Sequence, residues 1–498
     1  MKAAIAGGGI GGMMTALLLR KQGFDVVIYE KDDRLGGRLA FVEKDGFKID
    51  KGPTIVLLPE MFREFLREAG IDDEDYELIQ CDPLYDIHFN DGNSYTKYAD
   101  LQTQIEEIRR RFPGDELGFQ RFMKDMDIRF RLGKEKFLEK PFFKKKDFWN
   151  TPTLQTLLKL KAYKSVMENL KTYFSHEDLR TAYALQTLYI GGNPFVTPSI
   201  YSLVSYSEHK HGIYYLKGGY ASLTKVLENA LLKQGVTIRK GAPVNELLVD
   251  GKTAYGVSVN GQQERADLVV LNGDFPVAEK LLKKSVRKYE SSSSCFLLYM
   301  GLDKIYQDKN IHQFYLGEDF EENMNQVFSK EVLPEDPSIY VFHPSVVDPS
   351  LAPEGKGVLY VLVPVPAGDH IDWEREKDSY KEKIMIRLEE KGFTDLQKHM
   401  EWVQIRTPKE AMDEGLYMGG SFGIAPTLFQ SGIFRPQVKA GPYTNVYAVG
   451  ASTHPGGGIP IVMQGAHVLS ETIKKEWNLS SFPEKREDHE HSIRLSNL

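Results

Sequence analysis

The chain has 498 residues and a formal net charge of −7, with 41% hydrophobic and 27% charged residues. This length predicts two or three domains, and the composition is that of an ordinary globular enzyme. The negative charge argues against a general nucleic-acid-binding protein, so we expect no nucleic-acid partner. The two cysteines lie far apart and outside any metal-binding or redox motif, which is typical of proteins in a reducing cytosol.

The first glycine cluster of the chain predicts a binding site for a dinucleotide. An apolar run at residues 3–6 predicts a buried parallel strand, and a helical segment follows the glycines. Gly7, Gly9 and Gly12 fill a G-x-G-x-x-G pattern between these elements. In such a pattern the first glycine allows a tight turn, the second admits a pyrophosphate, and the third permits close helix–strand packing. The helix N-terminus offers free N–H groups to the same pyrophosphate.

A second predicted strand, residues 26–29, ends in Glu30. At this distance from the glycines, a carboxylate can accept hydrogen bonds from both hydroxyls of an adenosine ribose. Gly36, Gly37 and Arg38 follow, and this continuation resembles the extended FAD signature of glutathione-reductase-like flavoproteins. Because nicotinamide-binding units have no need of the glycine pair, we predict FAD as the cofactor.

Strands and helices alternate in the next part of the chain. A strand leads into a Gly-Pro turn at residues 52–53, and apolar residues at helical spacing predict a helix over 59–69. Alternation over 84–89, followed by an Asp-Gly turn, predicts a hairpin. Residues 100–131 are predicted to be helical and carry many charges.

Residues 128–171 differ sharply in composition from the rest of the chain. They contain twelve lysines and arginines against four acidic residues, with aromatic residues interleaved. Basic side chains beside exposed aromatic rings suit an anionic membrane surface. A solvated helical face whose aromatics belong to the core is the alternative. We expect a peripheral contact with the cytoplasmic membrane. We expect no membrane-spanning helix, because no apolar run approaches twenty residues apart from the glycine-containing segment at the N-terminus.

The second half of the chain begins with a segment that returns to the nucleotide site. Residues 208–211 hold two histidines two positions apart, and we predict a solvated turn there rather than a metal site. An amphipathic helix over 223–231 precedes strands at 244–249 and 254–259, whose Asp-Gly and Asn-Gly turns predict an antiparallel meander. Further strands are predicted over 266–271, 291–302, 339–343 and 357–364, and a helix over 378–391. Cys295 is expected to be a buried structural thiol rather than a nucleophile.

A second glycine-rich turn follows a predicted strand at residues 445–450. It contains His454, and a helix begins near Pro460, which suits a first helical turn. Such a turn is an anion site, and in this fold class it would lie under the flavin. His454 is the one candidate for a proton-transfer role, and a loop histidine that is hydrogen-bonded to the backbone is the favoured alternative.

Five segments together resemble the bacterial carotenoid desaturase family, of the phytoene and dehydrosqualene desaturase type. They are residues 7–38, 47–54, 212–223, 420–436 and 446–460. The FAD-binding residues that this resemblance implies are Gly7, Gly9, Gly12, Glu30, Gly36, Gly37, Arg38, Val244, Gly450, Gly457, Gly458 and Pro460.

The resemblance also implies the architecture. We expect an α/β, glutathione-reductase-like Rossmann domain for FAD, with an inserted α+β substrate domain and a helical membrane-facing part at about 128–171. The FAD domain would comprise residues 1–85, 212–280 and 436–478. The substrate domain would comprise 86–211 and 281–435, and 479–498 would form a charged tail.

The activity implied is desaturation of a long isoprenoid polyene, either phytoene or dehydrosqualene. A hydride would pass to the flavin, a neighbouring proton would leave, and a quinone or oxygen would accept the electrons. A terminal-methyl oxidase of the same family shares the motifs and stays open as an alternative. A flavin amine oxidase and a non-catalytic prenyl-lipid carrier of the GDP-dissociation-inhibitor type are further alternatives. Against the carrier stands the complete FAD motif, which a protein without FAD does not need.

Overall fold

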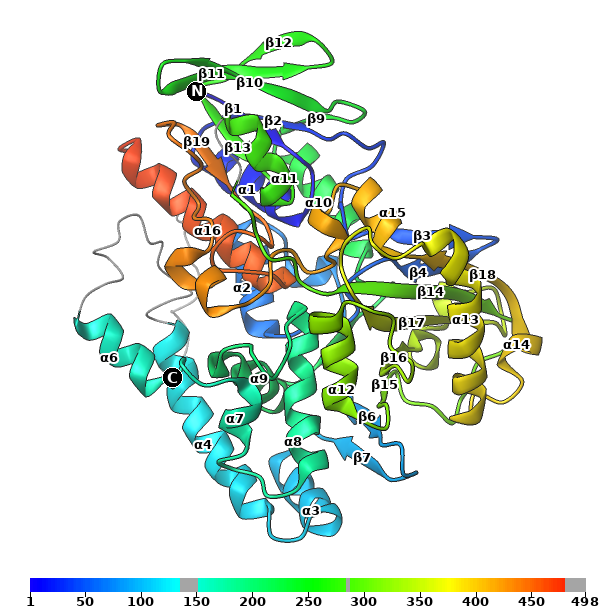
Figure 1. Cartoon of the computed structure of the whole chain (residues 1–498). Helices are drawn as coiled ribbons and strands as arrows, with labels where there is room; N and C mark the ends of the chain where they lie inside the picture. The colour runs from blue at the N-terminus through cyan, green and yellow to red at the C-terminus, as the bar shows by residue number, and fades with distance from the viewer. Residues whose placement is uncertain (135–150, 284–286, 480–498) are drawn as a thin grey trace, which may run out of the picture.

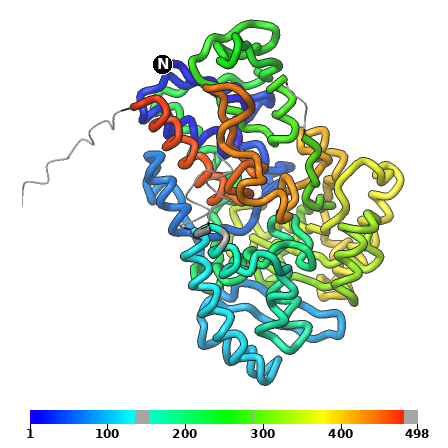
Figure 2. Tube along the Cα trace, turned by 60° about the vertical axis from the view of Figure 1, so that its left-hand side comes forward, coloured from blue at the N-terminus to red at the C-terminus, as the bar shows by residue number. Residues whose placement is uncertain are grey.

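The computed structural model describes residues 1–134, 151–283 and 287–479 of the chain (Figure 1). Two sheets organise this part of the molecule: a parallel sheet that contains the N-terminal strand, and a larger mixed sheet. The helix near the C-terminus, drawn in red in Figure 2, packs beside the first helix of the chain. The two ends of the described chain therefore contribute to the same part of the fold.

The parallel sheet has five strands, with β1 at its centre. Its order is β19 (Val446–Ala448), β13 (Leu268–Leu271), β1 (Lys2–Ala6), β2 (Asp25–Tyr29) and β9 (Thr237–Arg239). Ile5 of β1 lies opposite Ile28 on one side and Val270 on the other, and all pairings are parallel. Parallel pairing requires crossover connections, so this sheet gathers strands from widely separated parts of the chain.

Both faces of the parallel sheet are covered. The covering elements are the helices α1 (Ile10–Lys21), α10 (Ser222–Lys233) and α16 (Ile459–Glu476), and the meander β10 (Val244–Asp250), β11 (Thr253–Val259) and β12 (Gln262–Arg265). Ala3 and Ile5 pack with the helices, whereas Ala4 packs with the meander. Successive strand residues point to opposite faces, which is why β1 is apolar throughout. The strand–turn–helix–strand beginning and the antiparallel meander predicted from the sequence are confirmed.

The mixed sheet has seven strands. Its order is β18 (Met400–Arg406), β14 (Ser294–Leu302), β17 (Gly357–Val365), β16 (Ile339–Phe342), β15 (His312–Tyr315), β6 (Tyr85–His88) and β7 (Ser94–Lys97). Phe296 and Leu298 of β14 pack with α13 (Trp373–Glu390), while Leu297 and Tyr299 face the opposite core. All of β14 is buried. The sheet is thus the central layer of the larger half of the molecule.

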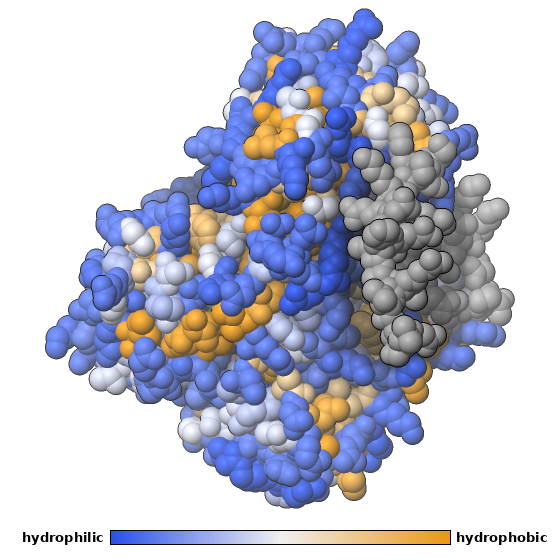
Figure 3. Space-filling view, turned by 180° about the vertical axis from the view of Figure 1, so that it is seen from behind, coloured by the Kyte–Doolittle hydropathy of each residue, from blue (hydrophilic) through white to orange (hydrophobic). Residues whose placement is uncertain are grey.

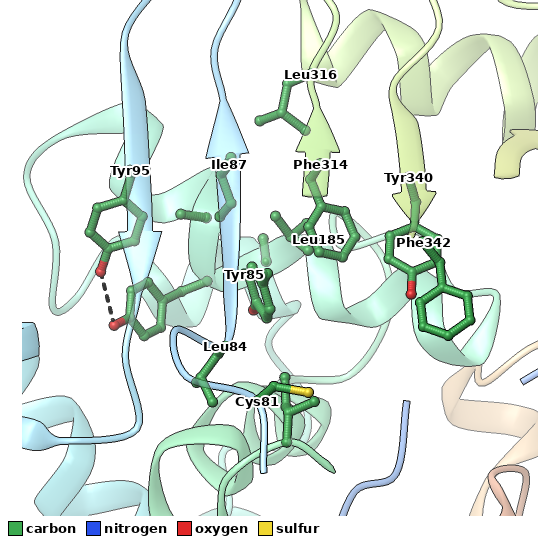
Figure 4. Packing of buried hydrophobic residues seen from close by; sticks show 14 of the residues in the cluster. Cys81, Leu84, Tyr85, Ile87, Tyr95, Leu185, Phe314, Leu316, Tyr340 and Phe342 are labelled. Carbon is green, nitrogen blue, oxygen red and sulfur yellow. Dashed lines mark hydrogen bonds between the residues drawn. The ribbon is translucent and has the colours of Figure 1, made fainter. Parts of the chain in front are cut away.

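Aromatic side chains fill the face of this sheet opposite α13. Figure 4 shows Phe314 of β15 and Tyr340 of β16 side by side on neighbouring strands, with Tyr85 of β6 next to Phe314. The ring centroids of Phe314 lie 4.9 Å from those of both Tyr85 and Tyr340. Such tilted and edge-to-face contacts add to the stability gained from burial.

A group of helices packs against this aromatic face. They are α3 (Leu101–Arg111), α4 (Glu116–Gly133), α7 (Val166–Leu170), α8 (Glu177–Ala184) and α9 (Leu203–His211). Leu157 of α6 (Thr151–Lys159) packs instead against Leu160, in a separate small cluster. The charged helical stretch predicted over 100–131 is therefore two helices, separated where Pro113 and Gly114 interrupt the pattern.

Two further predictions need correction. Residues 208–211 are not a solvated turn but the end of α9, because the Glu208 carboxylate is buried in an ion pair with Lys97 at 2.7 Å. The helix predicted over 378–391 begins earlier, at Trp373, because the Asp372 side chain caps it.

The remaining elements are short or connect the two halves. They are β3 (Phe41–Lys44), β4 (Phe47–Asp50), α2 (Pro59–Glu68), β5 (Leu78–Gln80), β8 (Tyr214–Leu216), α11 (Phe275–Ala278), α12 (Phe320–Asn325), α14 (Leu396–His399) and α15 (Pro408–Asp413). The domain boundaries stated above stay a prediction, and the tail at 480–498 lies outside the described residues.

Candidate active site

The first glycine cluster forms the turn between β1 and α1. Gly7 has a φ of +107°, and a Cβ there would lie 2.5 Å from the carbonyl oxygen of Asn272. A Cβ on Gly12 would lie 2.2 Å from the carbonyl oxygen of Gly7, so only glycine fits between helix and strand. Gly9 precedes α1, which has no side-chain cap, and the first N–H groups of the helix are therefore suited to an anion.

Glu30 lies at the end of β2 beside this turn. Its Oε2 accepts a hydrogen bond of 2.6 Å from the backbone N–H of Gly8, and its Oε1 accepts one of 3.0 Å from Asp32. The side chain is buried. Two backbone donors hold the carboxylate in one orientation, and each oxygen keeps a further lone pair for a ribose hydroxyl.

The Gly36–Gly37–Arg38 segment packs against the same turn. The backbone N–H of Gly36 donates to the carbonyl of Gly8 at 2.9 Å. Gly36 and Gly37 both have positive φ. Arg38 donates from Nη1 to the carbonyl oxygen of Ser421 at 2.8 Å. Burial lowers the pKa of the Arg38 guanidinium. The segment therefore joins the turn after β1 to a loop from the far end of the chain.

The second glycine-rich turn lies at the N-terminus of α16. Gly450 and Gly458 have φ values of +144° and +93°, which favour glycine. The helix begins at Ile459, carries Pro460 in its first turn and has no side-chain cap. A second set of backbone donors is thus available to an anionic or polar part of a ligand.

The side chain of Arg435 stabilises this turn, a role that was not predicted from the sequence. Its buried guanidinium donates to the carbonyl oxygens of Ala451 at 2.5 Å and Thr453 at 3.3 Å. Burial lowers its pKa. The only feature of the sequence that pointed to Arg435 was its position in segment 420–436, one of the five segments that carry the family resemblance. His454 is also buried in the turn, and its backbone N–H donates to the carbonyl of Pro436 at 2.7 Å.

A cavity of about 1460 Å³ connects the two turns with the apolar interior. The end that we call the nucleotide end is lined by Gly7, Gly9, Glu30, Gly36, Gly37, Arg38, Val244, Gly450, Gly457, Gly458 and Pro460, and His454 lies in the same wall. Gly12 is the one predicted FAD residue outside this lining, because it packs against the backbone of the first turn. Two capless helix N-termini and an oriented carboxylate fit the pyrophosphate, flavin and ribose of FAD.

The other end of the cavity, which we call the polyene end, lies between the mixed sheet and the helical group. Its wall is mainly apolar and includes Leu188, Leu203, Leu297, Phe314, Leu362 and Phe422. Cys295 also lies in this wall, and burial raises the pKa of its thiol to about 11. The thiol is therefore protonated near neutral pH and is a poor nucleophile.

Polar side chains also occur in the cavity lining, and two hydrogen-bonded groups among them were not anticipated from the sequence. Glu414 accepts hydrogen bonds from Lys51 at 2.5 Å and Arg406 at 2.8 Å. Burial opposes ionisation of Glu414, but the Arg406 guanidinium brings the pKa below its usual range. The second group joins the hydroxyls of Thr54 and Tyr340, which lie 2.7 Å apart. The partners come from distant segments and from different elements, so no local pattern marks them.

Exposed apolar side chains lie where the cavity reaches the surface. Leu158, Tyr163 and Phe429 are 65%, 65% and 69% exposed, and all three line the cavity. Apolar side chains also gather in a recess across the face shown in Figure 3. Of the basic segment 128–171, residues 135–150 lie outside the described residues. Arg129 is not a surface residue, because it is buried and donates to Asn169 at 3.1 Å.

No helix among the described residues is both long enough and apolar enough to cross a bilayer.

The fold and the site define an FAD-dependent oxidoreductase. Residues 10–466 match the family described as flavin containing amine oxidoreductase. The solved structure of cyclohexylamine oxidase from Brevibacterium oxydans IH-35A superposes with a TM-score of 0.62, covering 96% of this chain and 99% of that one. Its sequence identity of 14% means that this likeness concerns the fold alone.

Two curated relatives define the branch of the family. The chain is 60% identical, over 95% of its length and 97% of the relative, to a 4,4'-diapolycopen-4-al dehydrogenase of Metabacillus indicus. It is 35% identical, over 96% of its length and 99% of the relative, to a 4,4'-diapophytoene desaturase (4,4'-diaponeurosporene-forming) of Staphylococcus haemolyticus. The chain belongs to the flavin containing amine oxidoreductases and, within them, to the carotenoid desaturase family.

Proposed function

We propose that the protein oxidises the terminal aldehyde of a long linear C30 polyene to a carboxylic acid. The observation that carries this proposal is the 60% identity to a diapolycopenal dehydrogenase, against 35% to a diapophytoene desaturase. The apolar polyene end of the cavity supports a long hydrocarbon substrate. In the reaction, the aldehyde and one water give the acid with release of two protons and two electrons.

FAD, when bound, accepts the two electrons that leave the substrate carbon as a hydride. We assign its pyrophosphate to the turn around Gly9, its flavin to the turn around Gly458, and its ribose to Glu30. A quinone or oxygen would then reoxidise it. The chain's own contribution is to orient the polyene, to exclude bulk water from the apolar part of the cavity, and to admit the one water that the reaction consumes.

The substrate is a lipid, so we propose that the protein takes it from a membrane surface. The exposed side chains of Leu158, Tyr163 and Phe429 at the cavity mouth support this, because apolar and aromatic groups enter the headgroup region of a bilayer. Lys159, Lys161 and Lys164 next to them would favour anionic lipids.

Desaturation of a C30 or C40 polyene is the second candidate, and the full-length similarity to desaturases favours it. Purified, FAD-loaded protein supplied in liposomes with a C30 polyene monoaldehyde or with diapophytoene separates the two. We expect a product one oxygen heavier from the aldehyde, with the oxygen taken from isotope-labelled water. A product lighter by two hydrogens from diapophytoene, with the aldehyde unchanged, would replace this proposal with desaturation.

A further inference from the structure

A chain of three hydrogen-bonded side chains reaches the cavity wall from the core of the mixed sheet. The hydroxyl of Thr54 lies 2.7 Å from that of Tyr340, which lies 2.8 Å from Nδ1 of His312. Thr54 and Tyr340 line the cavity, whereas His312 is fully buried behind them. A polar chain of this kind is costly in an apolar wall unless each group is satisfied.

Thr54 lies where the nucleotide end of the cavity meets the polyene end. It follows β4 in a stretch that packs directly on the Gly36–Gly37–Arg38 segment. A Cβ on Gly52 would lie 2.8 Å from the carbonyl oxygen of Arg38, and the N–H of Lys51 donates to the carbonyl of Ala40 at 2.8 Å. Tyr340, the hydrogen-bond partner of Thr54, lies opposite Leu362 and contacts Phe314, which both belong to the apolar wall. We therefore place the reacting end of the polyene at this junction.

The histidine at the inner end of the chain is held neutral. Burial lowers the pKa of His312 to about 3. Its ring stacks on Phe342 with a centroid distance of 5.2 Å and an interplanar angle of 14°. Nε2 of His312 has no hydrogen-bond partner among the described residues, so a proton there would be a buried, unpaired donor. This favours the neutral tautomer with the proton on Nδ1, which donates to the Tyr340 oxygen, so that Tyr340 donates to Thr54.

That direction leaves the proton of the Thr54 hydroxyl without a partner in the part of the chain that the structure describes. Among the described residues, Tyr340 is the only side chain that hydrogen-bonds to the Thr54 hydroxyl. Thr54 is 8% exposed, so bulk water does not readily replace a ligand there. A carbonyl oxygen, which only accepts hydrogen bonds, complements the free donor.

We propose that the Thr54 hydroxyl binds the terminal oxygen of the polyene, with Tyr340 and His312 as positioning residues that orient it. This inference rests on the proposed function and names the group that would select an oxygenated end. A hydrocarbon end offers no acceptor and leaves a buried hydroxyl unpaired, which is the situation that gives polar sites their strongest discrimination.

Variants that remove single atoms test the proposal. Thr54→Val removes the hydroxyl at nearly constant volume, Tyr340→Phe removes the next hydroxyl, and Thr54→Ser keeps the hydroxyl. Tyr95→Phe is the matched control, because its hydroxyl is also buried and accepts a 2.8 Å hydrogen bond from Gln104 but lies outside the cavity lining. FAD content is measured for each protein, together with kcat, KM and the Kd of a C30 monoaldehyde and of the hydrocarbon of equal length.

We expect Thr54→Val to weaken aldehyde binding and to lower kcat/KM by about 10- to 100-fold, with FAD content and hydrocarbon binding unchanged. Tyr340→Phe should have a smaller effect in the same direction, while Thr54→Ser restores most of the activity and Tyr95→Phe changes nothing. Equal losses for aldehyde and hydrocarbon, or no change in Thr54→Val, would overturn the proposal.

The binding measurement keeps this proposal separate from the proposed reaction. If the wild-type protein prefers the aldehyde in binding but does not oxidise it, and Thr54→Val loses that preference, the proposed oxygen site is supported and the proposed reaction is overturned. If the wild-type protein binds the aldehyde and the hydrocarbon equally and desaturates the hydrocarbon, both proposals are overturned.

Discussion

The two ends of the cavity are built in different ways. The nucleotide end is formed by glycines, backbone N–H groups and one carboxylate that lie within short stretches of sequence, as in the turn from Gly7 to Gly12. The polyene end is formed by side chains from many strands and helices, and buried polar groups stand behind its apolar wall. Close backbone contact makes the first end intolerant of added atoms, whereas long-range pairing makes the second depend on complete side-chain networks.

The largest effect is expected from Gly12→Ala, which adds a methyl group at the nucleotide end. Its Cβ would lie 2.2 Å from the carbonyl oxygen of Gly7, so helix and strand cannot keep their present separation. We expect loss of FAD absorbance and at least a 100-fold loss of activity. Gly133→Ala is the control, since a Cβ there would make an ordinary contact of 3.7 Å. Normal FAD content in Gly12→Ala would contradict the assignment of the turn.

A second test breaks the network behind the polyene end. Lys97 and Glu208 form an ion pair with fully buried side chains, and Tyr85 donates to the same Glu208 oxygen at 2.7 Å. Glu208→Gln leaves the Lys97 charge unpaired, and we expect a loss of about 3–5 kcal/mol in the free energy of unfolding. The double variant Glu208→Gln with Lys97→Met should recover part of the lost stability. Urea unfolding measures the free energy of unfolding of each protein, and the FAD content of the folded fraction should stay normal in both variants.

Protein stability should respond to pH through Asp50, the last residue of the strand β4 that leads into the junction. Asp50, which accepts hydrogen bonds from the N–H groups of Tyr220 and Ala221 at 2.9 and 2.8 Å, has its pKa raised by burial to about 7. Between pH 4 and 7 the folded protein keeps a proton that the unfolded chain has lost, so stability falls as pH rises through this window. Above about pH 7 the stability no longer changes through this group.

Asp50→Asn cannot ionise and removes this dependence. Relative to the wild type, the variant should gain stability between pH 5 and pH 8, by at most about 3 kcal/mol. Thermal unfolding at several pH values measures the difference. A constant difference between the two proteins across this range would show that Asp50 is ionised throughout.

The smallest effect concerns the cavity mouth. Replacing Leu158 and Phe429 with serine should weaken binding to anionic liposomes by about 5- to 30-fold, because each exposed side chain would bury only part of its surface in lipid. Activity on substrate supplied in detergent should not change. Val332→Ser, an exposed apolar residue outside the cavity lining, is the control. Liposome binding equal to that of the wild type would place the membrane contact elsewhere.

Much of the nucleotide end could be predicted from sequence because its chemistry is local. A strand, a glycine turn, a helix and an acid must follow one another within about thirty residues to bind a dinucleotide, and each has a residue pattern of its own. The turn at the start of α16 is of the same kind, and its helix begins within a residue of the predicted proline. Backbone geometry that only glycine tolerates leaves a visible mark in a sequence.

The tertiary structure alone decided which side chains meet at the polyene end. Thr54 and Tyr340 are 286 positions apart, and Lys97 and Glu208 are 111 apart, so no periodicity links them. Glu208 looked solvated because a short stretch of charged residues and histidines is usually exposed, and only the packing of α9 beside β7 showed its partner Lys97. The sequence by itself determined the family, the cofactor and the local turns, whereas the pairing of buried polar groups followed from the register of distant strands, which depends on the whole core.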